Sequence, residues 1–211
     1  MSTPAYALLV AAIVLAVADW AAVATSRRRL EYATKVGVMV ALIGFAVVIH
    51  PASETQRWFF AVALALGLIS DVFLMLPRDL FLAGLVAALV EHLAYIAGFR
   101  ARELAIVWLA IALLIALVSV AVFLPPIHRA LRARRPALVA PVYAYVAVFV
   151  VMVASSGGTG SRVALAGALL FFYSDAILAW NRFVRPIRYG RVVNLVPYHL
   201  GQILLALSLI S

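Results

Sequence analysis

The sequence predicts an all-α integral membrane protein that crosses the bilayer eight times. Of its 211 residues, 67% are hydrophobic and only 12% are charged, whereas a soluble domain has about 45–50% apolar and about 25% charged residues. The mean hydropathy is +1.14. Long apolar runs lie between short charged clusters, and most approach the roughly 20 residues that a helix needs to span a bilayer. We therefore expect a single transmembrane domain over residues 1–211.

The expected spans cover about residues 4–25, 34–50, 57–76, 80–99, 104–124, 137–154, 162–181 and 192–210. The first run lacks a basic start and is too long for a signal peptide, so we interpret it as a retained span. Basic clusters, prolines and a glycine pair mark the ends of the runs, at Arg27–Arg29, His50-Pro51, Pro77-Arg78, Arg100–Glu103, Pro125-Pro126, Gly157-Gly158 and Arg182–Arg191.

The charged residues indicate the orientation of the spans. The net charge is +9, with sixteen Arg and one Lys. Thirteen of these seventeen lie in or beside the odd-numbered loops, which places those loops in the cytoplasm and both termini outside. Because the basic residues serve the membrane topology, we expect no nucleic-acid partner. The chain has no cysteine, so disulfides and thiolate chemistry are excluded.

A nine-residue similarity links the third and seventh spans. Ser70–Arg78 reads SDVFLMLPR and Ser174–Arg182 reads SDAILAWNR. The two spans are four apart and therefore point the same way, as in a parallel internal repeat of four plus four helices. A coincidental similarity between two helix ends is the alternative.

The two aspartates of this motif are the first candidates for chemistry. An acid at a helix centre in lipid costs about 2.5–3.5 kcal/mol, and Asp71 and Asp175 both lie on the order of 10 Å below the cytoplasmic interface. Each could be a packing acid with a hydrogen-bonded neighbour. The other reading is a catalytic pair, in which one carboxyl stays protonated as the acid and the other acts as the base. Ser70 and Ser174 could orient these acids or pack helices together.

Other polar residues lie near the same depth. Arg78 and Arg182 follow their aspartates by two helical turns, and each could anchor the cytoplasmic edge or hold a lipid phosphate. Asp19 and Lys35 could form an ion pair between the first two spans.

The fourth span carries Glu91, His92 and Tyr95 at positions that allow contacts along the helix. No second histidine lies nearby, so we expect His92 to be a hydrogen-bonding residue, and we expect no metal or cofactor. Three further tyrosines fit either an interfacial aromatic belt or an active site; they are Tyr143, Tyr145 and Tyr198.

Taken together, the order and spacing of these motifs resemble those of the YhhN-like family, which includes membrane lysoplasmalogenases. The resemblance covers about Thr34 to Leu207. It is carried by the two S-D-x-x-L segments, by Phe81-Gly84-His92-Tyr95, by Gly167-Ala168 and by Tyr198-x-x-x-Gln202. The family usually has Lys-Pro near the start of the second span, whereas Lys35 is followed here by Val36.

This resemblance implies an eight-helix enzyme of a bacterial plasma membrane. It implies hydrolysis of the vinyl ether bond of lysoplasmalogen, a lysophospholipid, to a fatty aldehyde and a glycerophospho-alcohol. We hypothesise that Asp71 and Asp175 are the acid–base pair. The expected substrate-binding residues are Lys35, His92, Tyr95, Tyr143, Ser174, Tyr198, Gln202, Arg78 and Arg182. A proton-linked transporter or lipid-binding protein is the rival interpretation, because buried acids and a repeat also suit transport.

Overall fold

A computed structural model of the chain describes residues 2–76 and 78–210. Within these residues, eight helical segments are long and apolar enough to cross a membrane, which confirms the predicted fold class. The main helices are α1 (Thr3–Ala24), α2 (Arg28–Val48), α3 (Glu54–Met75), α4 (Phe81–Phe99), α5 (Ile106–Arg134), α6 (Val139–Gly158), α7 (Arg162–Ala179) and α8 (Gly190–Leu207). Three shorter helical segments flank them, η1 (Pro136–Leu138), η2 (Trp180–Val184) and η3 (Ser208–Ile210).

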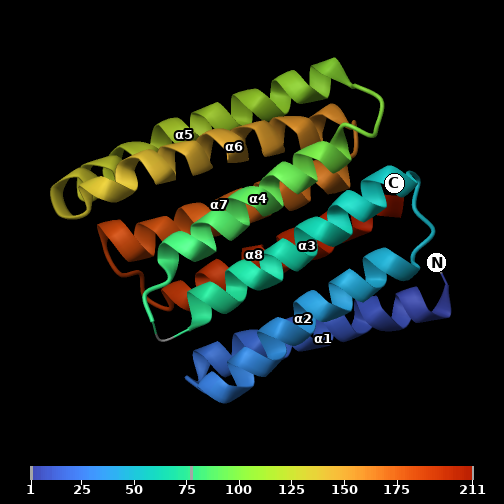
Figure 1. The fold of residues 1–211 in the computed structure, drawn as a ribbon, viewed down its shortest axis with the longest axis horizontal. Helices are drawn as coiled ribbons and strands as arrows, with labels where there is room; N and C mark the ends of the chain where they lie inside the picture. The colour runs from blue at the N-terminus through green and yellow to red at the C-terminus, as the bar shows by residue number, and fades with distance from the viewer. Residues whose placement is uncertain (1, 77, 211) are drawn as a thin grey trace.

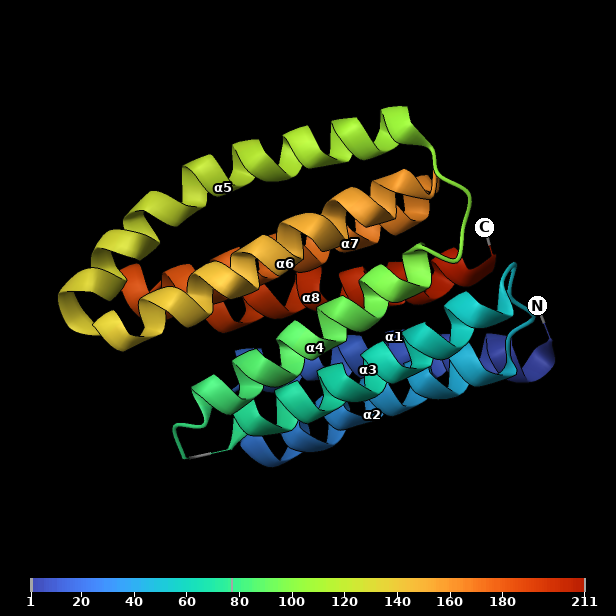
Figure 2. The same ribbon diagram turned by 45° about the horizontal axis from the view of Figure 1, so that its top comes forward.

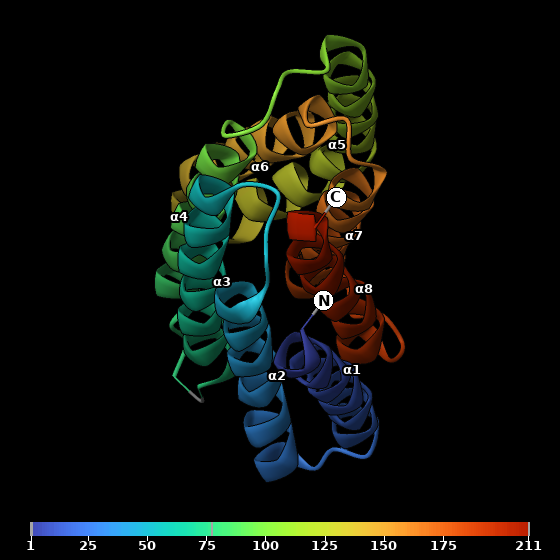
Figure 3. The same cartoon turned by 90° about the vertical axis from the view of Figure 1, so that its right-hand side faces the viewer.

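Consecutive helices pair as antiparallel hairpins, α1 with α2, α3 with α4, α5 with α6 and α7 with α8 (Figure 1). Contacts of α2 with α3, α4 with α6, α6 with α7 and α8 with α2 then close a ring of six helices. The view along the bundle in Figure 3 shows this arrangement. Helix α1 packs against α2 and α8, and α5 packs against α6, α7 and η2. The four-plus-four repeat stays a prediction.

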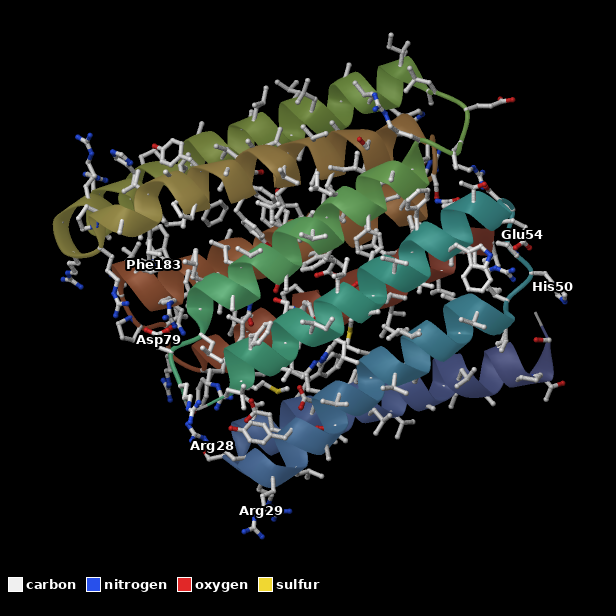
Figure 4. All side chains as sticks on the ribbon, in the orientation of Figure 1. Arg28, Arg29, His50, Glu54, Asp79 and Phe183 are labelled. Atoms are coloured by element: carbon white, nitrogen blue, oxygen red, sulfur yellow. The ribbon has the colours of Figure 1, made fainter. Side chains whose placement is uncertain are left out.

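The two ends of the bundle differ in charge. We call the basic end the one at which α1, α3, α5 and η2 finish. Figure 4 shows Arg28, Arg29 and Asp79 at this end and His50 and Glu54 at the other. Both ends of the chain lie at the end opposite the basic one (Figure 1). Which end faces the cytoplasm stays a prediction.

Helix α5 is longer than the sequence predicts. Pro125-Pro126 was expected to end it, but both prolines lie inside the helix, which continues to Arg134 and bends along its length (Figure 2). Proline removes a backbone donor and normally breaks a helix. Here Ile127 and Leu131, on the far side of the prolines, are buried in a cluster with Phe81 and Phe183. This packing accounts for the continued helix.

The glycine pair predicted to form a turn is also helical. Gly157 and Gly158 end α6, and the turn follows at Thr159 and Gly160, where Gly160 has a φ of 72°. A Cβ on Gly157 would lie 2.7 Å from the carbonyl oxygen of Trp108 on α5. Gly157 therefore serves close helix packing. The other predicted end marker, Pro77, lies outside the described residues.

Helices α7 and α8 approach each other equally closely. A Cβ on Gly167 would lie 3.0 Å from the carbonyl oxygen of Gly201, and a Cβ on Gly201 would lie 3.0 Å from that of Gly167. Small residues allow such backbone contact between membrane helices. After Ala179, the chain of α7 continues as the π-helical η2. A π-turn inside a helix is often found at a functional site.

Candidate active site

A cavity of about 490 Å³ lies inside the helix ring, within the size range of small-molecule sites. Every main helix except α1 contributes to its lining. It extends from Arg28 and Arg191, which are exposed at the basic end, to the buried Glu91 and Phe149 further in. Asp71 and Asp175 both line it. The repeated motif thus delivers its two acids, from α3 and α7, to one enclosed space.

Asp71 has a cation and a hydroxyl as partners. The Nζ atom of Lys35 lies 2.7 Å from its Oδ1 atom, and the Tyr198 hydroxyl donates to Oδ2 at 2.6 Å. The Lys35 ammonium also lies 5.2 Å from the centroid of the Tyr198 ring. All three side chains are buried. A fixed ammonium and a hydroxyl donor both stabilise the ionised form of a carboxyl, so this site suits a carboxylate at Asp71.

Asp175 has different surroundings. It accepts a hydrogen bond from the hydroxyl of Tyr145, and that hydroxyl also lies 3.3 Å from Nε2 of His92. Across residues 2–76 and 78–210, no cation lies within ion-pairing distance of Asp175. The two carboxyls of the cavity therefore differ in the way that an acid–base pair requires.

A third carboxyl lies at the inner part of the cavity. Gln202 donates to Oε1 of Glu91 at 2.6 Å, and it accepts a hydrogen bond from the Tyr95 hydroxyl at 2.6 Å. All three side chains are buried, but only Glu91 lines the cavity. Of the predicted substrate-binding residues, Tyr95 and Gln202 thus lie behind Glu91, and His92 lies behind Tyr145.

The expected ion pair between Asp19 and Lys35 is wrong. Asp19 instead accepts a hydrogen bond from Thr34 at 2.7 Å and lies 3.9 Å from Nε2 of His199. Adjacent residues of a helix point about 100° apart. Because Thr34 faces α1, its neighbour Lys35 faces the cavity and reaches Asp71 on α3.

The two serines of the repeat have different contacts. Ser70 donates to the carbonyl oxygen of Gly84 at 2.9 Å and so links α3 to α4. Ser174 accepts a hydrogen bond from the Asn194 side chain at 3.0 Å, and the same amide donates to the Ser174 carbonyl oxygen. Both serines line the cavity, and both also hold neighbouring helices together.

Arg78 and Arg182 do not line this cavity. They line a second pocket of about 420 Å³ at the basic end. Arg182 donates to Oδ1 of Asp79 at 2.6 Å, and its guanidinium lies 4.2 Å from the centroid of the Phe81 ring. The Arg182 guanidinium holds the pKa of the exposed Asp79 carboxyl below its usual range. The two arginines therefore lie outside the space that holds the aspartates.

Tyr143 also lies away from the cavity. Its side chain is 41% exposed, and its hydroxyl lies 3.1 Å from Nδ1 of His128 on α5. Tyr145, two residues later, points inward. A step of two residues turns a helix by about 200°, so the two tyrosines cannot both face the cavity.

Sequence reasoning missed several residues that line the cavity. They are Arg28, Glu31, Glu91, Tyr145, Asn194 and Arg191. Glu31 and Arg191 form an ion pair at the opening of the cavity. The signal for Glu31 was available, since an acid in a cytoplasmic cluster of arginines stands out. Its partner Arg191 lies 160 residues away, and no local pattern links the two.

Comparison with known proteins identifies the family. The YhhN family model matches residues 30–209. This chain belongs to the YhhN family. Within that family it is similar to human lysoplasmalogenase TMEM86B, with 29% identity over 170 residues, which is 81% of this chain and 71% of the human protein. Mouse lysoplasmalogenase TMEM86B is 30% identical over 173 residues, with the same coverage of both chains. No solved structure matches this YhhN protein.

Proposed function

We propose that this protein is a membrane hydrolase that cleaves the vinyl ether bond of lysoplasmalogen. The observation that carries the proposal is that Asp71 and Asp175 line one cavity with unlike partners, an ammonium for the first and a tyrosine hydroxyl for the second. The similar human and mouse proteins, which are named lysoplasmalogenases, support the same substrate. The enzyme belongs in the membrane because its substrate is a lysophospholipid.

The reaction needs one acid and one carboxylate. The acid gives a proton to the outer carbon of the vinyl ether, and the electron pair of the double bond forms the new C–H bond. The resulting oxocarbenium ion takes up water at the carbon next to oxygen, and a proton from that water returns to the protein. The hemiacetal then breaks its bond to the glycerol oxygen, which yields the aldehyde and an alcohol. General acid–base catalysis of this kind requires no covalent intermediate.

The surroundings of the two carboxyls suggest their roles. We assign Asp175 as the proton donor, since it has a tyrosine hydroxyl beside it and lacks a cation partner in the described part of the chain. We assign Asp71 as the carboxylate that faces the cation and accepts the proton of water, since Lys35 and Tyr198 hold it ionised. Opposed surroundings for two titratable groups are the mark of such a pair.

The test is aldehyde release by purified protein from lysoplasmalogen, with the saturated ether lipid as the negative control. We expect Asp71→Asn and Asp175→Asn each to abolish release. Asp79→Asn, which alters an exposed acid outside the cavity, should retain it. Near-normal turnover by either cavity variant would refute the assignment. A transporter or lipid-binding protein would release no aldehyde with any variant.

Solvent isotope labelling tests the proton-transfer step itself. In D₂O, protonation of the outer carbon places one deuterium next to the aldehyde carbon, so immediate reduction and mass spectrometry should find a singly labelled alcohol. Attack at the glycerol carbon would leave that position unlabelled and would disprove the mechanism.

A further inference from the structure

The opening of the cavity contains a carboxylate with one unused oxygen. Glu31 is only 3% exposed and lines the cavity near Arg28. Arg191 donates to its Oε1 atom. Its Oε2 atom is buried and accepts no hydrogen bond from residues 2–76 and 78–210. A buried charged group that lacks a partner costs more free energy than a hydrogen bond contributes, so this oxygen needs a donor.

The same opening offers cations that face solvent. Arg28 lies one helical turn before Glu31 and is exposed. Arg191 is 55% exposed at its side chain and uses its Nη2 atom on Glu31. The remaining N–H groups of a guanidinium suit the oxygens of a phosphate. The site thus places an anion-binding group beside a cation-binding group.

We propose that this opening binds the phosphoethanolamine headgroup of a lysophospholipid, with the phosphate on Arg28 and Arg191 and the primary ammonium on Glu31. The proposal rests on the proposed function for the rest of the lipid, and it adds the headgroup that the enzyme selects. The torsion that turns a carboxylate about its last bond is broad, so Oε2 can turn toward the cavity and meet the ligand.

The hydrogen-bonding capacity of the ammonium decides between the two common headgroups. A primary ammonium carries three N–H donors, one of which can pair with Oε2 of Glu31. The trimethylammonium group of choline has no N–H and would leave that oxygen without a partner. A site built to hydrogen-bond a ligand group discriminates strongly against an analogue that lacks it. We therefore expect ethanolamine lipids to bind more tightly than choline lipids.

Binding of saturated lyso-ether lipids tests the headgroup site separately from hydrolysis. Two lipids with the same chain, one with phosphoethanolamine and one with phosphocholine, are titrated into the purified protein in detergent. We expect the wild type to favour ethanolamine on the order of tenfold, the size of one hydrogen bond to a charged group. Glu31→Gln should remove most of this preference and leave choline binding within about twofold. Glu54→Gln, at the other end of the bundle (Figure 4), should change neither.

Further arms separate the other outcomes. Arg191→Gln should weaken both lipids alike, because both carry the phosphate. Free phosphoethanolamine should compete poorly, and competition equal to that of the lipid would contradict a lipid site. Equal loss of both lipids in Glu31→Gln would mean that Glu31 acts only by holding Arg191, and would overturn the proposal. If Glu31→Gln does not elute as a single species, a wild-type preference for choline or for neither lipid overturns it.

Because the lipids are not hydrolysable, this result is independent of catalysis. If no aldehyde forms from lysoplasmalogen but the ethanolamine preference is present and depends on Glu31, then the proposed reaction fails and the headgroup site stands. If aldehyde forms from both headgroups at equal kcat/KM and binding shows no preference, then the reaction stands and the headgroup site fails.

Discussion

Lys35 is the residue on which the state of Asp71 depends, since it is the cation within 2.7 Å of that carboxylate. Breaking a buried ion pair by removing one partner costs about 3–5 kcal/mol, because it leaves a buried charge uncompensated. We expect Lys35→Met to lower the Tm of the purified protein markedly and to abolish turnover. Thermal unfolding in detergent provides the measurement.

The double variant Lys35→Met with Asp71→Asn serves as the control for this prediction. Since it removes both charges, it should recover part of the lost stability without recovering activity. A single Lys35→Met variant as stable as the wild type would show that the ion pair contributes nothing to folding.

The two tyrosines of α6 provide a matched pair of variants. Tyr145→Phe removes the hydroxyl that contacts Asp175, so we expect kcat to fall on the order of tenfold to a hundredfold, as for a lost hydrogen bond to a charged group. Tyr143→Phe removes a hydroxyl outside the cavity and should leave kcat unchanged. Aldehyde release measured for both variants decides the point, and a larger loss in Tyr143→Phe would reverse the assignment of faces.

Individual residues could be predicted only in part. Asp71 and Asp175 stand out as acids in apolar runs, and the structure brings both to the cavity. The inward face of α6 could not be predicted, because residues 139–154 are apolar on all sides apart from the two tyrosines. A helix that is hydrophobic all round has no periodicity to show which side faces inward.

Among the helices, the crossing of α7 and α8 constrains the site most tightly. We expect Gly201→Ala to destabilise the protein, since its Cβ would meet the backbone nitrogen of Phe171 at 2.9 Å and overpacking costs about 1–3 kcal/mol. It should also lower activity by moving Tyr198 away from Asp71. Gly44→Ala is the control, because its Cβ would meet only the flexible end of Leu8 at 3.4 Å. Equal Tm values for the two variants would contradict this account.

Helix number followed from hydropathy, but two helix ends did not. Pro125-Pro126 and the Gly157-Gly158 pair are usual signs of an end, and both lie within helices. In each case tertiary packing outweighs the local preference: Leu131 is fully buried beyond the prolines, and Gly157 allows close approach to α5. Such packing depends on residues far apart in the sequence, so local signals could not reveal it.

For the whole molecule, the orientation in the membrane is directly testable. The chain has no cysteine, so a single introduced cysteine gives an unambiguous label. We expect Arg29→Cys to react with a membrane-impermeant maleimide only after cells are opened, and His50→Cys to react in intact cells. These positions lie at opposite ends of the bundle (Figure 4). The reverse pattern would place the basic end outside and invert the predicted topology.

The arrangement of the helices around the cavity lay beyond the sequence. Span order and the likeness of the third and seventh spans could be predicted, but not that α4 contacts α6 while α5 packs outside. Lipid-facing and protein-facing residues are equally apolar in a bilayer. Polar residues alone carry information about the inside, and on α5 those facing inward are few.

Helix α5 has a consequence for the fate of the products. Only 17% of its most apolar stretch is buried, less than in the other spans, yet Val120 and Phe123 line the cavity. It is therefore the wall that can move with the fewest lost contacts. By that route a greasy aldehyde would dissolve directly into the bilayer, while the glycerophospho-alcohol leaves past Arg28 into water. Two products that enter different phases seldom meet again, which makes cleavage effectively one-way.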